Sequence, residues 1–402
     1  MRLPAVLFGL ASILALYLFG RQVTSASESL LAAALLTFSY HHVWFSQNAR
    51  GYTGLLFWTL LSSWLLLRAL RTGWRGQWLL YAVSLALGLY THFTMVFPIV
   101  GQLAVYGLEF LRRHRSRQRQ DWGGLLLGFG LGGLLTLGLY GPVLPEMLGN
   151  MGRETSLVAE WKNPLWTLAE IAKGLQISFF SGLVAVAAVT VFGVGLVSYA
   201  RSEPYVAVLL IVPVLVCIAV VVGLGHHLWP RFFFFAFGFG ALVIIRGTMT
   251  AGQLAGRWLL RWPAARSATL GLAASLGLIA VSALSLPFAY GPKQDYEGAL
   301  RYVTAAQEPG DVVATADLAA FPYKKYYQTD WRVVENLEDL KTLRSGAKRT
   351  WFVYTFPQVL KSVAPDILTS VQRDFQMVET FDGTLNGGTV YVVRADAATP
   401  SR

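Results

Sequence analysis

Charged side chains are scarce in this chain of 402 residues. Asp, Glu, Lys and Arg together make up 14% of the sequence, whereas a soluble domain carries about 25%. Hydrophobic residues account for 54%, and the mean hydropathy is +0.49. This composition excludes an ordinary soluble protein and indicates a protein that lives in a membrane.

Acidic residues are rarest in the first part of the chain. Only 8 of the 22 lie in residues 1–290, and 14 lie in residues 291–402. We therefore predict two domains, one surrounded by lipid and one by water. They are a transmembrane helical domain over 1–290 and an extracytoplasmic α/β domain over 291–402. The basic residues of the first domain lie between apolar segments, as in cytoplasmic loops of membrane proteins, which disfavours nucleic acid as a partner.

Cysteine and histidine are also sparse. The one cysteine, Cys217, can form no intrachain disulfide. Residues 291–402 contain no histidine and no Gly-rich phosphate loop, so no His-based metal site or nucleotide site is visible there. We interpret this region as a cap over the membrane domain, with recognition of a glycan or other acceptor as the alternative.

Ten apolar segments are candidates for membrane-spanning helices, each of which needs about 20 residues. The run from Trp78 to Phe110 is too long for one span, and we divide it at the polar Tyr90-Thr91-His92. The ten lie near 4–20, 29–45, 53–70, 77–91, 93–111, 123–145, 178–200, 204–224, 232–246 and 268–289. If these spans alternate, four arginine clusters share one side, which we predict to be cytoplasmic. The N-terminus and the tail then lie outside.

The tail alternates β-branched runs with amphipathic stretches, the pattern of an α/β unit. Strands are predicted at 311–315, 332–335, 350–354, 377–381 and 389–393. Helices are predicted at 296–306, 337–343 and 359–375, and Asn386-Gly387-Gly388 indicates a turn before the last strand.

Polar residues gather where the predicted spans meet the outer membrane face. Polar groups at membrane depth cost about 2.5–3.5 kcal/mol each, which favours a function for those that persist. Arg50 and Arg231 carry planar guanidinium groups that can grip a phosphate bidentately, and snorkelling at the interface is the alternative. The other candidates on this face are Asn48, Tyr52, His41, His42, His92, His226 and His227. Together they predict a polar cavity that opens outward and holds a lipid-linked phosphate.

These residues resemble a known family. Gly20-Arg21, the segment from Ser46 to Tyr52, Tyr90-Thr91-His92, Pro230-Arg231-Phe232-Phe233 and Gly310-Asp311-Val312-Val313 resemble landmarks of the integral-membrane glycosyltransferases with the GT-C fold, the protein O-mannosyltransferase and aminoarabinose transferase superfamily. The resemblance implies a polytopic helical membrane protein with a C-terminal extracytoplasmic α/β domain. It also implies transfer of a sugar from a polyprenyl-phosphate carrier to a glycan, lipid or protein acceptor on the extracytoplasmic side.

The resemblance assigns roles to single residues. Arg50 and Tyr52 would contact the phosphate of the carrier or its approach, and His92 and Arg231 match further family positions. Phe232 stands where the family usually has Tyr. Asn48 stands where the family commonly has Glu, and because an amide cannot act as a base or carry the charge that holds a cation, this substitution argues against metal binding and full activity. A divalent metal is still possible, and no cofactor is certain.

The start of the chain also departs from the family pattern. The family has one further span and a first loop with the catalytic carboxylate, and this sequence shows no counterpart, so we leave the catalytic residue unassigned. The acids in the outer loop between the sixth and seventh spans are alternatives: Glu146, Glu154, Glu160 and Glu170. The leading hypothesis is a glycosyltransferase of a bacterial inner membrane. The alternative is a non-catalytic GT-C-like subunit or scaffold that binds membrane lipids and partner proteins in a complex.

Overall fold

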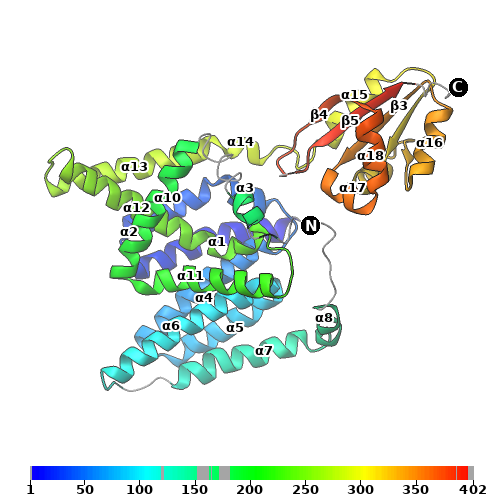
Figure 1. The fold of residues 1–402 in the computed structure, drawn as a ribbon. Helices are drawn as coiled ribbons and strands as arrows, with labels where there is room; N and C mark the ends of the chain where they lie inside the picture. The colour runs from blue at the N-terminus through cyan, green and yellow to red at the C-terminus, as the bar shows by residue number, and fades with distance from the viewer. Residues whose placement is uncertain are drawn as a thin grey trace. The chain divides into compact units, whose positions relative to one another are not determined.

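The computed structural model describes residues 2–118, 122–151, 163, 165–171, 182–385 and 387–396. Contacts divide these residues into two compact units, one that ends at Ala289 and one that begins at Tyr290. Each unit is described by itself below, and Figure 1 labels their helices and strands.

The first unit is a bundle of helices, with a helix in each of the ten segments predicted to span the membrane (Figure 1). Among the described residues, six helical stretches are long and apolar enough to cross a bilayer. The bounds are α1 Leu3–Val23, α2 Ala26–Thr37, α3 Tyr40–Ser46, α4 Tyr52–Thr72, α5 Arg75–Thr91, η1 Phe93–Met95, α6 Val96–Arg115, η2 Gly124–Gly130, α7 Leu131–Tyr140, α8 Leu144–Met151, α10 Gly182–Ser202, α11 Pro204–Gly223, η4 Pro230–Ala236, α12 Phe237–Trp258, α13 Ala264–Leu284 and α14 Leu286–Ala289. The prediction of a polytopic helical membrane protein is confirmed.

The second predicted span differs from the structure, because residues 29–45 do not form one helix. Ser39 has an extended backbone, with φ −83° and ψ 125°, and this residue separates α2 from α3. The hydroxyl of Thr37, the last residue of α2, donates a hydrogen bond to the Ala33 carbonyl oxygen in the preceding turn of the same helix. The chain therefore reaches residues 46–52 through a short separate helix.

A polar network lies between α4, α5 and α6. The hydroxyl of Tyr81 donates to Gln102 Oε1 over 2.9 Å, and Gln102 Nε2 donates to Ser62 Oγ over 2.6 Å and to Ser63 Oγ over 3.0 Å. All four side chains are buried. Hydrogen bonds between polar side chains stabilise helix packing where lipid offers no partner, so this network fixes the helices whose ends carry the candidate site.

The second unit is a five-stranded mixed sheet with helices on both faces. Its elements are α15 Tyr296–Ala306, β1 Asp311–Thr315, η5 Asp317–Ala319, η6 Pro322–Tyr326, β2 Arg332–Val333, α16 Leu337–Ser345, β3 Arg349–Thr355, α17 Pro357–Val363, α18 Pro365–Asp374, β4 Gln376–Phe381 and β5 Val390–Asp396. The strand order is β2-β1-β3-β5-β4, with β1 parallel to β2 and β3. One core packs α16, α17 and α18 on the sheet, and the other packs α15 and η6. The predicted C-terminal α/β fold is confirmed.

Two details of the tail differ from the sequence prediction. The single helix expected over 359–375 is two helices, because Pro365 has no N–H to continue the hydrogen-bond ladder and starts α18 instead. The predicted turn at Asn386-Gly387-Gly388 includes Asn386, which lies outside the described residues.

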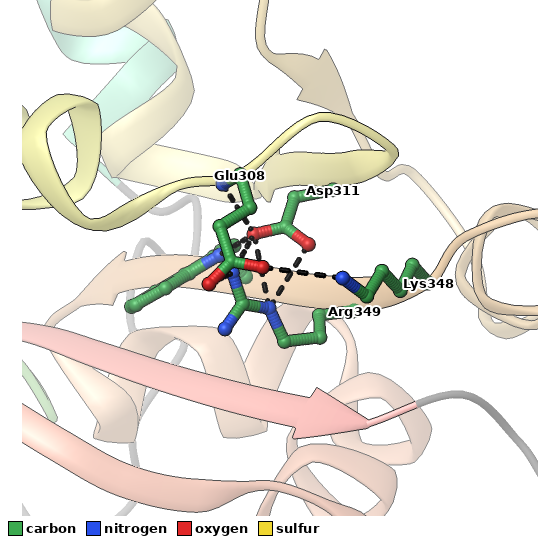
Figure 2. A network of polar contacts seen from close by, with 5 residues as sticks. Glu308, Asp311, Lys348 and Arg349 are labelled. Carbon is green, nitrogen blue, oxygen red and sulfur yellow. Dashed lines mark hydrogen bonds and ion pairs between the residues drawn. The ribbon is translucent and has the colours of Figure 1, made fainter.

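A charged network joins the beginnings of β1 and β3, as Figure 2 shows. Arg349 donates to both carboxylate oxygens of Asp311 at 2.7–3.1 Å, and the Trp351 indole donates to Asp311 Oδ2 over 3.0 Å. Glu308 pairs with Arg349 at 3.3 Å and with Lys348 at 3.2 Å. Burial pulls the pKa of Asp311 upward, but the hydrogen bonds from Arg349, the Glu308 backbone and Trp351 outweigh it and lower the pKa to about 2. Asp311 thus holds two parallel strands in register.

Candidate functional site

The candidate site is built around the N-terminus of α4. Gly51 is the N-cap of α4, with φ −72° and ψ 10°, and a Cβ placed on it would lie 2.6 Å from the Thr91 carbonyl oxygen and 3.4 Å from His92 Cδ2. Only glycine allows the backbone of residue 51 to approach the end of α5 this closely. This contact brings Tyr52, the first residue of α4, beside His92.

Aromatic side chains surround Tyr52, which is buried. Its ring centroid lies 4.9 Å from that of His92, 5.1 Å from that of Phe45 in α3 and 6.4 Å from that of Phe234 in η4. Phe45 and Phe234 also contact each other at 4.4 Å. Aromatic pairs at these separations stabilise packing beyond the area they bury. They hold four elements that are distant in the sequence in one place.

His92 lies in the break between α5 and η1. Its Nδ1 accepts a hydrogen bond from the Thr94 backbone N–H over 3.3 Å, and the Thr94 hydroxyl lies 2.8 Å from the same nitrogen. Burial lowers the pKa of His92, and the positive charge of Arg231 lowers it further. The ring is therefore neutral at pH 7, and with Nδ1 acting as acceptor its proton is on Nε2. His92 can donate a hydrogen bond from Nε2 to a ligand.

Arg231 enters the same cluster from the start of η4. Pro230 begins this helix, and the guanidinium of Arg231 lies 4.5 Å from the ring centroid of Trp229. Arg231 is within electrostatic range of both Tyr52 and Arg50. In the part of the chain that the structure describes, Arg231 Nε is buried and has no hydrogen-bond partner. A buried donor without a partner is costly, and an anionic ligand would supply the acceptor.

The remaining candidates lie on the rim of this cluster or turn away from it. Asn48 is 9% exposed, and its Nδ2 donates to the Trp44 carbonyl oxygen of α3 over 3.3 Å. His227 packs edge-on against Trp229 at 5.9 Å, which links it to Arg231, and His226 precedes it in the same loop. His42 is buried near Gly9 of α1, and His41 packs on Tyr40 and Phe237.

The donor set at the site does not suit a divalent cation. Arg50 and Arg231 are positively charged, and the Asn48 amide is turned back onto α3. Hard cations are held by carboxylates and carbonyl oxygens. Among the residues that the structure describes, no group of three or more His, Cys, Asp and Glu could hold a metal ion. The cluster is suited to an anion instead.

The structure brings Arg50, Tyr52, His92 and Arg231 together from three parts of the sequence. Sequence reasoning missed the residues that hold them. Trp229 stacks on Arg231, Thr94 orients His92, Phe45 and Phe234 enclose Tyr52, and Gly51 permits the close approach. The glycine between two candidate polar residues was the one signal that could have pointed to a backbone contact.

Two carboxylates in the described helices of the bundle are paired with arginines. Glu28 pairs with Arg246 at 3.0 Å, and Glu109 pairs with Arg112 and Arg113 at 2.7 and 2.8 Å. Of the four loop acids, Glu146 is exposed in α8 and Glu170 is half-buried. Glu154 and Glu160 lie outside the described residues.

Comparison with protein families supports the resemblance read from the motifs. Residues 1–131 match the model of the family described as dolichyl-phosphate-mannose-protein mannosyltransferase. This segment holds the residues from Ser46 to Tyr52 and the Tyr90-Thr91-His92 motif, so the resemblance to GT-C integral-membrane glycosyltransferases is confirmed there. A search of curated protein sequences finds no match.

A search of solved structures finds matches of low sequence identity. ArnT from Cupriavidus metallidurans in the apo state has 14% sequence identity and a TM-score of 0.47, and the match covers 100% of this chain and 84% of ArnT. The structure of ArnT bound to undecaprenyl phosphate has 14% sequence identity and a TM-score of 0.42. The match covers 100% of this chain and 85% of ArnT. The Archaeoglobus fulgidus oligosaccharyltransferase in complex with Zn and sulfate has 12% sequence identity and a TM-score of 0.46. This chain spans 60% of the length of that oligosaccharyltransferase.

Proposed function

We propose that this protein is a membrane glycosyltransferase that moves a sugar from a polyprenyl-phosphate carrier to an acceptor at the extracytoplasmic face of a bacterial inner membrane. The observation that carries the proposal is the buried Nε of Arg231, which lacks a partner and lies within electrostatic range of Arg50 and Tyr52. Two like charges that have no acidic partner among the described residues attract an anion. The family match over residues 1–131, which includes Arg50, Tyr52 and His92, supports a sugar-linked phosphate as that anion.

The site residues divide the work of such a transfer. Arg231 and Arg50 bind the carrier phosphate and stabilise the charge that grows on it as the sugar leaves. His92 donates from Nε2 to a phosphate oxygen or a sugar hydroxyl. Trp229 holds the Arg231 guanidinium in place, and Tyr52 with its aromatic neighbours excludes water. A carboxylate must still deprotonate the acceptor, and we leave that residue unassigned.

The second candidate function is a non-catalytic subunit that binds a polyprenyl phosphate and partner proteins in a membrane complex. The observation that favours it is Asn48, an amide that donates to the Trp44 carbonyl oxygen where the family commonly has Glu. Both functions require the same phosphate site, so binding and transfer must be measured separately.

The experiment uses the full chain in lipid nanodiscs. Binding of undecaprenyl phosphate is compared between the wild type, Arg50→Ala and Arg231→Gln, with Arg201→Gln at the exposed end of α10 as the matched loss of one charge. We expect at least tenfold weaker binding in the first two variants and no change in the control. Equal affinity in all four proteins would refute the phosphate site.

Transfer is then followed with a panel of undecaprenyl-phosphate-linked sugars and an acceptor membrane extract. Release of undecaprenyl phosphate that requires Arg50 and Arg231 supports the transferase. Tight binding without turnover of any donor supports the non-catalytic subunit.

A further inference from the structure

A second group of arginines lies at the other end of the bundle and is not used by the proposed transfer. It surrounds a cavity of about 370 Å³ between α4, α6 and α11. The cavity is lined by Leu67, Leu70, Arg71, Glu109, Arg112, Arg113 and Tyr205. Arg71 is in the last turn of α4, whose first residue is Tyr52, so the two sites are about 30 Å apart along this helix.

The charges of this cavity do not cancel. Glu109 is the one acid among the lining residues and is 7% exposed. It accepts from Arg112 Nε and Nη2 at 2.7 Å, from Arg113 Nε at 2.8 Å and from the Tyr205 hydroxyl at 2.6 Å. Three guanidinium groups therefore face one carboxylate, which leaves a net charge of about +2 at the cavity.

The arginines also keep donors that their protein contacts do not use. Arg71 donates to the Gln22 side chain over 3.3 Å and to the Gln22 carbonyl oxygen over 2.9 Å. Arg113 Nη2 donates to the Leu70 carbonyl oxygen. Each guanidinium has five N–H groups, and the hydrogen bonds described above use two on Arg71 and two on Arg113. These contacts hold the forks in position before a ligand arrives.

The walls of the cavity identify the class of ligand. Leu67 and Leu70 supply an apolar side on α4, which spans the membrane, and the arginines lie at its end, where lipid headgroups are. Basic pockets between transmembrane helices bind the headgroups of anionic lipids. A phosphodiester with an acyl chain satisfies both the arginines and the leucines, whereas a free phosphate satisfies the arginines alone.

We propose that this cavity, the Glu109 pocket, is a binding site for the headgroup phosphate of an anionic phospholipid. The bound lipid would join α4, α6 and α11 at the end of the bundle opposite the carrier site. The proposal stands independently of sugar transfer, because none of its residues belongs to the Arg50 cluster.

The test measures lipid retention by native mass spectrometry of the full-length protein in mixed phosphatidylglycerol and phosphatidylcholine. The variants are Arg71→Gln and Arg112→Gln, and the matched control is Arg68→Gln, which removes an exposed charge from the same helix outside the cavity. We expect the wild type and Arg68→Gln to prefer phosphatidylglycerol, and each cavity variant to lose about fivefold of that preference. Arg71→Lys, which keeps the charge, should retain most of it.

Three outcomes would overturn the proposal. The wild type retains both lipids equally, Arg68→Gln loses as much preference as the cavity variants, or millimolar inorganic phosphate displaces the lipid. The second outcome would assign the effect to general surface charge, and the third would assign the cavity to a soluble anion. Thermal unfolding of each variant verifies that the comparison is made between folded proteins, and Arg112, whose side chain is 59% exposed, can be replaced without opening the core.

Discussion

Gly51→Ala tests whether the close approach between α4 and the end of α5 positions the carrier site. The backbone of Gly51, with φ −72° and ψ 10°, is one that alanine also adopts, so the substitution introduces no backbone strain. Its effect comes from the added methyl group alone, which would lie 2.6 Å from the Thr91 carbonyl oxygen. The two segments must therefore separate, and overpacking of this kind costs about 1–3 kcal/mol.

The separation also moves Tyr52 away from His92. A displacement of about 1 Å in a binding or catalytic geometry can cost about 100-fold in rate. We expect Gly51→Ala to weaken binding of undecaprenyl phosphate at least tenfold and to lower the thermal unfolding temperature of the full-length protein. Both are measured in nanodiscs, by equilibrium binding and by differential scanning fluorimetry.

Gly240→Ala is the matched control. Gly240 lies in α12, and a Cβ at this position meets no atom within 4 Å. Alanine is favoured over glycine inside a helix by about 1 kcal/mol, so this variant should bind normally and be equally or more stable. If Gly51→Ala behaves like Gly240→Ala in both assays, the contact with Thr91 does not position the site and the reasoning is refuted.

Three further substitutions test the other contacts. Arg231→Lys keeps the charge but loses the planar fork and the stacking on Trp229; we expect about tenfold weaker binding of undecaprenyl phosphate, and unchanged affinity would show that a point charge suffices. Gln102→Leu leaves the Tyr81 hydroxyl without its acceptor, so thermal unfolding should reveal a loss of about 1 kcal/mol with normal binding. Asp311 has a pKa lowered to about 2, below its ordinary 3.8, so its stabilising effect is complete above about pH 4 and is lost as the pH falls through 2. After a discount for solvent screening, Asp311→Asn should therefore destabilise β1 and β3 by about 1 kcal/mol at pH 7 and have little effect at pH 2. The measurement is hydrogen exchange of these strands, corrected for the intrinsic pH dependence of exchange. An equal effect at both pH values would contradict the ion pair.

Local elements could be predicted from the sequence because their signals are local. The polar Tyr90-Thr91-His92 indicated the end of a helix, and α5 does end at Thr91. The strand predicted at 311–315 and the helix predicted at 296–306 have the bounds that the structure shows. Ser39 and Pro365 each divide a segment that hydrophobicity alone joins, because hydropathy does not register one extended residue or one missing N–H.

The candidate site could be predicted only in part. Arg50, His92 and Arg231 were recognisable as costly polar groups at the membrane face, but their grouping depends on contacts between distant segments. Trp229 under Arg231 and Phe234 against Tyr52 are such contacts. In an apolar sequence, an aromatic residue that lines a binding site cannot be distinguished from one that faces lipid.

The distribution of acids favours the proposal that the bundle binds an anion. Glu28 is used by Arg246, and Glu109 is shared by Arg112, Arg113 and Tyr205. Each carboxylate is thus neutralised inside the protein. Among the described residues, Arg231 has no carboxylate partner, and its buried Nε donates no hydrogen bond. Because a buried donor without a partner is costly, the proposed site predicts that binding of a carrier phosphate recovers part of the energetic cost of Arg231, whether or not a sugar is transferred afterwards.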